Sequence, residues 1–195
     1  VCAARTQADI DTTVQLAQTF GIEALAIKTN TKSEAQLTQL VKQSVEHFGK
    51  ISILVNNAGG SMPNDPLATS AEQFNSDYHF NVTSPFLLAQ LCAPIMQKNG
   101  QGNIINITSA AARYSQKNFS SYGSAKAALT QLTRLLAADL APIIRVNAIA
   151  PGTIYTDALA QFLNDASVQK MIDLTPMKTL GKPEDIANTA LFLAS

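Results

Sequence analysis

Residues 51–60 form the stretch ISILVNNAGG, in which a short apolar run leads directly into two asparagines, an alanine and two glycines. A short run rich in Ile, Leu and Val is typical of a strand that is buried on both faces of a parallel sheet. Glycines after such a strand let the backbone approach a ligand, and asparagine amides hydrogen-bond within a turn. A turn without a ligand uses the same residues, so this stretch alone predicts the strand and leaves the role of the turn open.

The same alternation of short apolar runs and longer helical stretches continues along the chain. Strands are predicted at 1–4, 24–28, 51–56, 103–108 and 143–148. Helices are predicted at 9–20, 33–48, 70–96 with a break near 81–85, 121–140 and 183–194. This pattern predicts one α/β domain over residues 1–195, a Rossmann-like doubly wound parallel sheet. Ligands of such sheets bind outside the carboxyl ends of the strands, so function is expected in the segments that follow them.

Composition and net charge indicate which kind of partner the protein binds. The chain has 195 residues, 46% of them hydrophobic, with 14 basic and 14 acidic side chains. This balance creates no net field that would recruit nucleic acid or an anionic membrane, so small-molecule partners are expected. Cys2 and Cys92 indicate reduced thiols and therefore the cytoplasm. His47 and His79 have no partners at ligand spacing, so no metal site is predicted.

Tyr122 and Lys126 are four residues apart near the start of a predicted helix, which places them on the same face one turn apart. Tyrosine is a poor base at neutral pH, but a neighbouring cation favours the phenolate, which can exchange a proton with an alcohol or a carbonyl oxygen. A solvated helix face is the alternative for this pair. Tyr114 has Asn118 at the equivalent spacing and is predicted to be a pocket wall rather than the base.

Ser109 follows a predicted strand, thirteen positions before Tyr122. A hydroxyl at the carboxyl end of the sheet can hold a substrate oxygen and stabilise developing charge. A serine that caps a helix or forms a turn is the alternative, and it would be preferred if Ser109 stood alone.

Taken together, these features resemble the short-chain dehydrogenase/reductase family over the entire chain. The matching segments, in the family's order, are NNAG at 56–59, Asn81 within FNV, Ser109, Tyr122 with Lys126, APGT at 150–153 and GKPED at 181–185. The resemblance implies an oxidoreductase that moves a hydride between a nicotinamide dinucleotide and a carbonyl or secondary alcohol. It also implies a catalytic set of Asn81, Ser109, Tyr122 and Lys126.

The resemblance assigns a role to each member of this set. Tyr122 donates the proton in reduction, and Ser109 holds the carbonyl. Lys126 favours the phenolate and hydrogen-bonds the nicotinamide ribose. Asn81 anchors a water chain that relays protons to Lys126. A kink in the long helix is the alternative role for Asn81, and the resemblance includes that role as well.

Further residues resemble the family's cofactor contacts. Those on the adenosine side are Asn57, Ala58 and Gly59, and those toward the nicotinamide and phosphates are Pro151, Gly152, Ile154 and Thr156. Asn30 stands where the family usually has an aspartate that touches the adenine.

The carboxyl end of the strand at 1–4 indicates which nucleotide is used. An NAD enzyme carries an acidic residue there for the adenosine ribose, whereas arginine accommodates the 2′-phosphate of NADP. Residues 1–7 contain no carboxylate, and Arg5 offers a planar donor fork that suits a phosphate. The sequence therefore favours NADP(H) over NAD(H). A surface arginine that flanks a helix is the alternative for Arg5, but the missing acid argues independently.

Residues 152–182 lie where the family has its substrate lid, and they predict an apolar or extended substrate. The apolar lid residues are Tyr155, Leu159, Phe162, Leu163, Met171, Ile172 and Leu174. Several runs look closest to bacterial hydroxysteroid dehydrogenases and β-ketoacyl carrier-protein reductases, and the substrate's identity stays open. A non-catalytic dinucleotide-binding or regulatory protein of the same fold is the second hypothesis. The resemblance also implies a homodimer or homotetramer built through the helices at 70–96 and 121–140.

The resemblance makes residues 1–4 the second strand of the sheet, without the first strand or its glycine-rich turn. It also places Ser195 before the family's last strand. We therefore expect the chain to be a fragment of low activity. Strands 1–4 and 51–56 should face each other across roughly 10 Å, a gap one strand wide.

Overall fold

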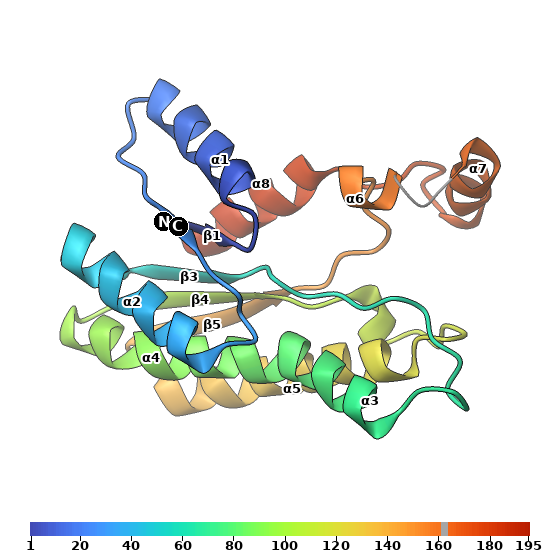
Figure 1. Ribbon diagram of the computed structural model, residues 1–195, viewed down its shortest axis with the longest axis horizontal. Helices are drawn as coiled ribbons and strands as arrows, with labels where there is room; N and C mark the ends of the chain where they lie inside the picture. Colours follow the sequence, from blue (N-terminus) through green and yellow to red (C-terminus); the bar gives the residue numbers. More distant parts are fainter. Residues whose placement is uncertain (161–163) are drawn as a thin grey trace.

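The computed structural model describes residues 1–160 and 164–195, apart from the side chains of residues 157 and 158, and contains two parallel sheets flanked by helices (Figure 1). One sheet pairs β1 (Cys2–Ala4) with β2 (Ala26–Lys28). The other has the order β3-β4-β5, formed by Ile53–Asn56, Gly102–Ile107 and Ile144–Ile149. Each predicted strand is present, and the predicted parallel α/β class is confirmed.

The predicted helices are present in the predicted order, and the structure adds two helices in the lid. The helices are α1 (Gln7–Thr19), α2 (Glu34–Phe48), α3 (Ala71–Tyr78), α4 (Ser84–Lys98), α5 (Ser120–Leu140), α6 (Asp157–Ala160), α7 (Asp165–Leu174) and α8 (Pro183–Ala194). The break expected near 81–85 is a five-residue π-helix, His79–Thr83, between α3 and α4. The lid helices α6 and α7 were not predicted. Asn164 gives the missed signal for α7, since its side chain accepts a hydrogen bond from the backbone of Ser167 at 2.9 Å.

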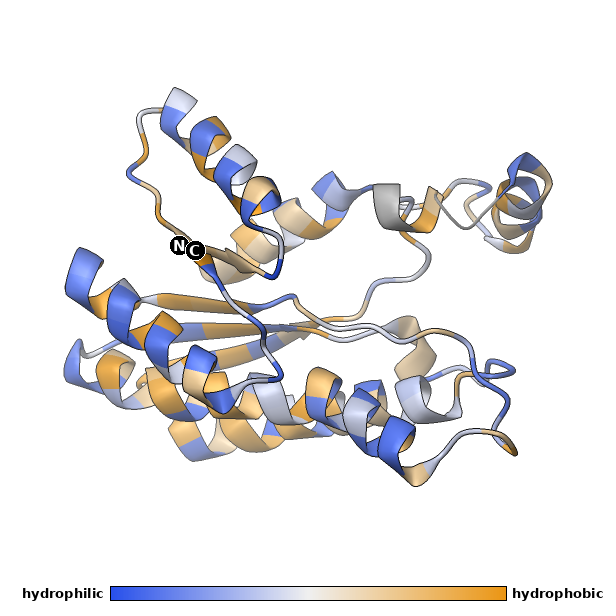
Figure 2. Ribbon diagram, viewed as in Figure 1, coloured by the Kyte–Doolittle hydropathy of each residue, from blue (hydrophilic) through white to orange (hydrophobic). Residues whose placement is uncertain are grey.

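Helices cover both faces of the larger sheet. Figure 1 shows α2, α4 and α5 on one face, and α8 with α1 on the opposite side. The core lies between this sheet and the helices α2, α4 and α5. Leu37, Met96 and Ile104 are fully buried there. Figure 2 shows apolar residues on the strands and on the helix surfaces that face them. Cys92 belongs to this core, and burial raises the pKa of its thiol to about 12.

The two sheets are not hydrogen-bonded to each other. A cavity of about 650 Å³ lies between them, lined by β1 residues such as Ala3 and by all of β3. β1 and β3 are therefore separate strands with a cavity between them, as expected, and the separation of roughly 10 Å stays a prediction. Ile53 and Val55 remain 48% and 46% exposed on β3, and Asn56 Oδ1 is buried without a hydrogen-bond partner among the described residues.

The register of the larger sheet decides where the functional segments lie. Asn56 of β3 pairs with Asn106 of β4, and Ile107 of β4 pairs with Ile149 of β5. The segments that begin at Asn57, Thr108 and Ala150 therefore leave the sheet from the same edge. Within the described residues, no helix has the length and apolar character needed to cross a membrane.

Candidate active site

Lys126 occupies the centre of the site, on the side of α5 that faces the sheet. Its Nζ donates a hydrogen bond to the backbone oxygen of Ile107 at 2.8 Å, and the residue is only 3% exposed. Burial without a compensating charge lowers the pKa of Lys126 to about 8. The ion pairs formed by the described residues do not include it. At neutral pH the side chain is thus a largely protonated, poorly solvated cation.

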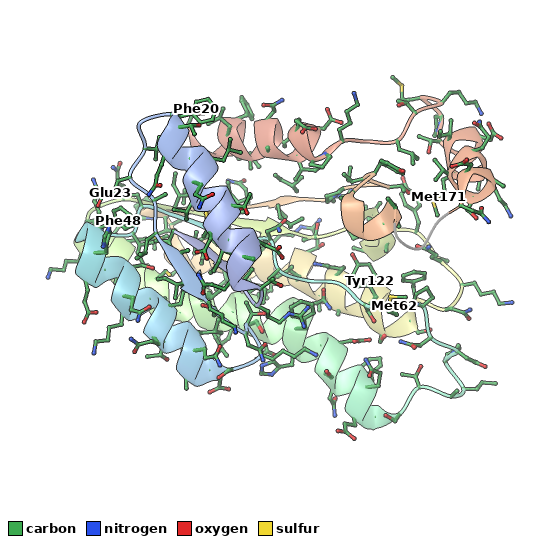
Figure 3. The ribbon with its side chains drawn as sticks, turned by 45° about the horizontal axis from the view of Figure 1, so that its top comes forward. Phe20, Glu23, Phe48, Met62, Tyr122 and Met171 are labelled. Atoms are coloured by element: carbon green, nitrogen blue, oxygen red, sulfur yellow. The ribbon has the colours of Figure 1, made fainter. Side chains whose placement is uncertain are left out.

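Tyr122 lies one turn before Lys126 on the same helix, as predicted. The Lys126 ammonium is 5.8 Å from the centre of the Tyr122 ring, and Phe119 packs edge-on against that ring. Figure 3 shows Tyr122 toward the end of the molecule that carries Met171 of α7. The phenol therefore stands at the carboxyl edge of the sheet, within the field of a buried cation.

Asn81 clamps the segment after β3 from its position in the π-helix. Its Nδ2 donates to the oxygens of Gly60 and Asp77, and its Oδ1 accepts from the Gly60 backbone N–H at 2.9 Å. The residue is fully buried. Asn81 thus makes these hydrogen bonds from within the π-helix, and π-helical turns often mark functional sites. Its role as a kink residue stays a prediction.

Gly59 lies beside both the Asn81 side chain and the Lys126 ammonium. A Cβ at this position would approach Lys126 Nζ to 2.7 Å and Asn81 Oδ1 to 2.9 Å. Only a residue without a side chain lets the backbone pass so close to both groups.

Ser109 is the second residue of the segment that leaves β4. Its hydroxyl oxygen accepts a hydrogen bond from the Ala111 backbone at 3.1 Å, so the capping role considered for this serine is present. Accepting that bond leaves the hydroxyl proton available for donation. The next residue, Ala110, donates to the oxygen of Pro151 at 2.8 Å and so joins the segments after β4 and β5.

The expected cofactor residues fall into two groups. Arg5, Asn57, Ala58 and Gly59 line the same cavity between the sheets. Pro151, Gly152, Ile154 and Thr156 lie beyond β5 and outside that lining; Ile154 pairs with Gly181, and the Thr156 hydroxyl caps the backbone of Leu159. Asn30 turns its Oδ1 to the Lys32 backbone at 3.1 Å, and its neighbours Thr29 and Thr31 line the cavity instead.

A family model described as enoyl-(acyl carrier protein) reductase matches residues 1–195. The chain belongs to the short-chain dehydrogenase/reductase family. It is 47% identical over 179 residues to 7α-hydroxysteroid dehydrogenase of Escherichia coli (strain K12), covering 91% of this chain and 70% of that one. It is 34% identical over 176 residues to 3-oxoacyl-[acyl-carrier-protein] reductase of Synechocystis sp., and the match covers 90% of this chain and 70% of that protein. A solved 7α-hydroxysteroid dehydrogenase complexed with NADH and 7-oxo glycochenodeoxycholic acid superposes with a TM-score of 0.94 at 44% identity, covering 99% and 76%.

The chain is therefore an oxidoreductase of a family that uses nicotinamide dinucleotides, and its own residues fit such a group. The cavity carries the Arg5 guanidinium just after β1 and the side-chain-free backbone of Gly59. Asn56 lines the same cavity and has a side-chain oxygen that no described residue satisfies. These are features of a site that binds a polar ligand.

The lid of this short-chain dehydrogenase/reductase is partly described. Leu174 is 75% exposed and Tyr155 is 46% exposed. Phe162 and Leu163, two of the expected apolar lid residues, lie outside the described residues. Tyr114 lines a second cavity, of about 350 Å³, as a pocket-wall residue would.

Sequence reasoning missed two features of the site. The carbonyl of Ile107, which holds Lys126, belongs to a strand and has no sequence signature. Asp77 is 4% exposed and accepts hydrogen bonds from Ser61 and Ser121, which are far apart in the sequence. A weak local signal was available, because Gln73 and Asp77 are spaced for a side-chain pair on one helix face.

Proposed function

We propose that this protein is a carbonyl reductase and secondary-alcohol dehydrogenase of apolar substrates, with a preference for NADP(H). The observation that carries the proposal is the buried ammonium of Lys126 beneath Tyr122, held at the edge where the strands end. A fold that only binds a nucleotide has no need of a tyrosine that a buried ammonium activates. Burial of this kind is costly unless the charge is used.

Tyr122 is the proposed proton donor in reduction. Its hydroxyl gives a proton to the carbonyl oxygen, which becomes the alcohol, and the resulting phenolate is favoured by the Lys126 ammonium. When bound, a reduced nicotinamide dinucleotide supplies the hydride to the carbonyl carbon. Proton and hydride together balance the reduction, and the reverse transfers oxidise the alcohol.

Ser109 and Asn81 support this proton transfer in different ways. The Ser109 hydroxyl is oriented by Ala111 through its oxygen and keeps its proton for the substrate oxygen. Asn81 holds the Gly60 backbone through two hydrogen bonds and bonds the Asp77 backbone oxygen through a third. The water relay expected at Asn81 remains a prediction.

Lys126 and the cavity residues are the proposed nucleotide contacts. Lys126 would reach the nicotinamide ribose, and Asn57, Ala58 and Gly59 would line the adenosine side. Arg5 is exposed where β1 ends, on the same cavity, and can donate to a 2′-phosphate. No acidic side chain stands in residues 1–7 to bind a free ribose hydroxyl. The relative of known structure contains NADH, so the choice for this protein rests on these residues.

An apolar substrate is supported by the lid and by the relatives. Leu174, the last residue of α7, and Tyr155 expose apolar surface in the segment that follows β5. The relatives named above include a hydroxysteroid dehydrogenase at 47% identity. A steroid ketone is thus the first substrate to test, and a 3-oxoacyl thioester is the second.

The proposal is tested with a complete enzyme that carries this sequence. The assay follows the loss of nicotinamide absorbance when NADPH or NADH is mixed with a panel of ketones. The panel contains 7-oxo glycochenodeoxycholic acid, an acetoacetyl thioester and a small aliphatic ketone. We expect turnover of an apolar ketone, faster with NADPH at equal concentrations. Tight nucleotide binding without turnover of any ketone would instead indicate the non-catalytic alternative.

The oligomeric state is proposed from the family resemblance. We propose a homodimer or homotetramer through α4 and α5, whose outer surfaces expose Phe86 and Leu135. We also place the protein in the cytoplasm, where its two free thiols stay reduced. Light scattering after gel filtration tests the assembly, and a monomer at micromolar concentration would contradict it.

A further inference from the structure

Asp77 connects three separate parts of the active site. Its Oδ2 accepts a hydrogen bond from Ser121 Oγ at 2.6 Å and another from Ser61 Oγ at 2.7 Å. Its Oδ1 accepts from Gln73 Nε2 at 2.9 Å, and its backbone oxygen accepts from Asn81 Nδ2 at 2.9 Å. Hydroxyl-to-carboxylate bonds this short belong to the stronger class of hydrogen bonds. One residue of α3 therefore touches the segment after β3, the π-helix and the start of α5.

The start of α5 depends on this contact. Its N-cap residue, Phe119, provides no side-chain cap, and the first turn contains no acidic residue. Ser121 lies in that turn, immediately before Tyr122. The Asp77 carboxylate thus supplies, from another helix, the negative charge that the positive end of a helix favours. Without it, the turn that carries Tyr122 has fewer restraints than the turn that carries Lys126.

We propose that Asp77 is a positioning residue for Tyr122. Through Ser121 it holds the first turn of α5 in place, and through Ser61 and Asn81 it ties that turn to the backbone beside Lys126. This inference rests on the proposed function, in which Tyr122 transfers the proton. Displacement of a reacting group by about 1 Å can reduce a rate roughly a hundredfold. Loss of Asp77 should therefore lower kcat far more than it changes ligand affinity.

The test compares Asp77→Ala, Asp77→Asn and Ser121→Ala with the wild type. The substrate is 7-oxo glycochenodeoxycholic acid, and NADPH binding is followed by its fluorescence. For Asp77→Ala we expect kcat to fall roughly ten- to a hundredfold, with KM and the nucleotide Kd within about twofold. The kcat of Asp77→Asn should lie between those of the wild type and Asp77→Ala, because an amide oxygen still accepts a hydrogen bond. The kcat of the double variant Asp77→Ala/Ser121→Ala should be no lower than that of Asp77→Ala, because both changes remove the same hydrogen bond between Ser121 and Asp77.

Hydrogen exchange gives a readout that does not need turnover. Amides of residues 120–124 should exchange about tenfold faster in Asp77→Ala, whereas those around Lys126 should change less. Asp11→Asn is the matched control, because Asp11 accepts from Gln7 at 2.8 Å in the same four-residue spacing but on the exposed surface of α1. It should leave kcat and exchange unchanged. If Asp77→Ala does not fold, Ser121→Ala alone carries the test.

Two results would overturn this role. One is wild-type kcat and wild-type exchange in Asp77→Ala or Ser121→Ala. The other is a loss of kcat that matches a loss of folded protein at the assay temperature. Tyr122→Phe in the same assay separates the two proposals, because a fully active Tyr122→Phe would reject the proposed function, whereas an inactive one beside a fully active Asp77→Ala would reject only the role of Asp77.

Discussion

Replacement of Lys126 by methionine should stabilise the unliganded protein while it removes activity. Burial lowers the pKa of Lys126 from 10.5 to about 8, which corresponds to about 3 kcal/mol of free energy that folding loses by keeping the ammonium buried. Methionine has a similar length and removes that cost. It also leaves the Ile107 carbonyl without its 2.8 Å partner, which costs about 1 kcal/mol. The free energy of unfolding should therefore rise by about 2 kcal/mol at pH 7.

The pH dependence provides a sharper check of the same argument. The pKa of Lys126 is lower in the folded state than in the unfolded state, so between about pH 8 and 10.5 the unfolded chain binds more protons. The stability of the wild type should therefore rise across this window relative to the variant, and the advantage of Lys126→Met should disappear near its upper end. Groups that titrate alike in both proteins cancel in this difference.

Urea unfolding of the wild type and Lys126→Met at pH 7, 9 and 10 measures both effects. Lys42→Met is the matched control, because the side chain of Lys42 is 63% exposed on α2. The free energy of unfolding of Lys42→Met should differ from that of the wild type by less than about 0.5 kcal/mol. A Lys126→Met protein that is less stable than the wild type at pH 7, by an amount that does not vary with pH, would refute the reasoning.

Two further substitutions test the nucleotide side of the site. Arg5→Ala should raise the Kd of NADPH roughly ten- to a hundredfold, because one charge-assisted contact is lost, and leave that of NADH within twofold in a fluorescence titration; an equal loss for both would reject the phosphate contact. Gly59→Ala places a Cβ 2.7 Å from Lys126 Nζ and 2.9 Å from Asn81 Oδ1, so kcat should fall at least tenfold while circular dichroism stays that of the wild type. Wild-type kcat in Gly59→Ala would mean that the segment can move aside.

The strands and long helices could be predicted because local pattern and tertiary burial agree in them. The strand before Asn56 is apolar, its turn is rich in glycine and asparagine, and it lies where the pattern places it. The break near Asn81 could also be predicted, since Pro85 and β-branched neighbours disfavour a continuous helix. The π-helical form of that break depends on contacts with Gly60 and Asp77 and has no local signature.

The parts of the site that escaped prediction depend on contacts between distant residues. Asp77 meets Ser121 across 44 positions of sequence, and Lys126 meets a strand carbonyl across 19. Periodicity assigns a residue to a helix face but does not say which polar group of another element it meets there. The lid helix α7 was missed for a different reason. It has ten residues, which is too few for hydrophobic periodicity to distinguish a helix from a loop.

The central claim is that Tyr122 transfers the proton, and the most direct measurement compares Tyr122→Phe with Tyr114→Phe. Each change removes one hydroxyl, but Tyr114 is 73% exposed and lies outside the Lys126 site. Turnover of 7-oxo glycochenodeoxycholic acid and the Kd of NADPH are measured for both. Tyr122→Phe should lose about a thousandfold in kcat with a Kd within twofold of the wild type, while Tyr114→Phe keeps its activity. Wild-type kcat in Tyr122→Phe would contradict the account.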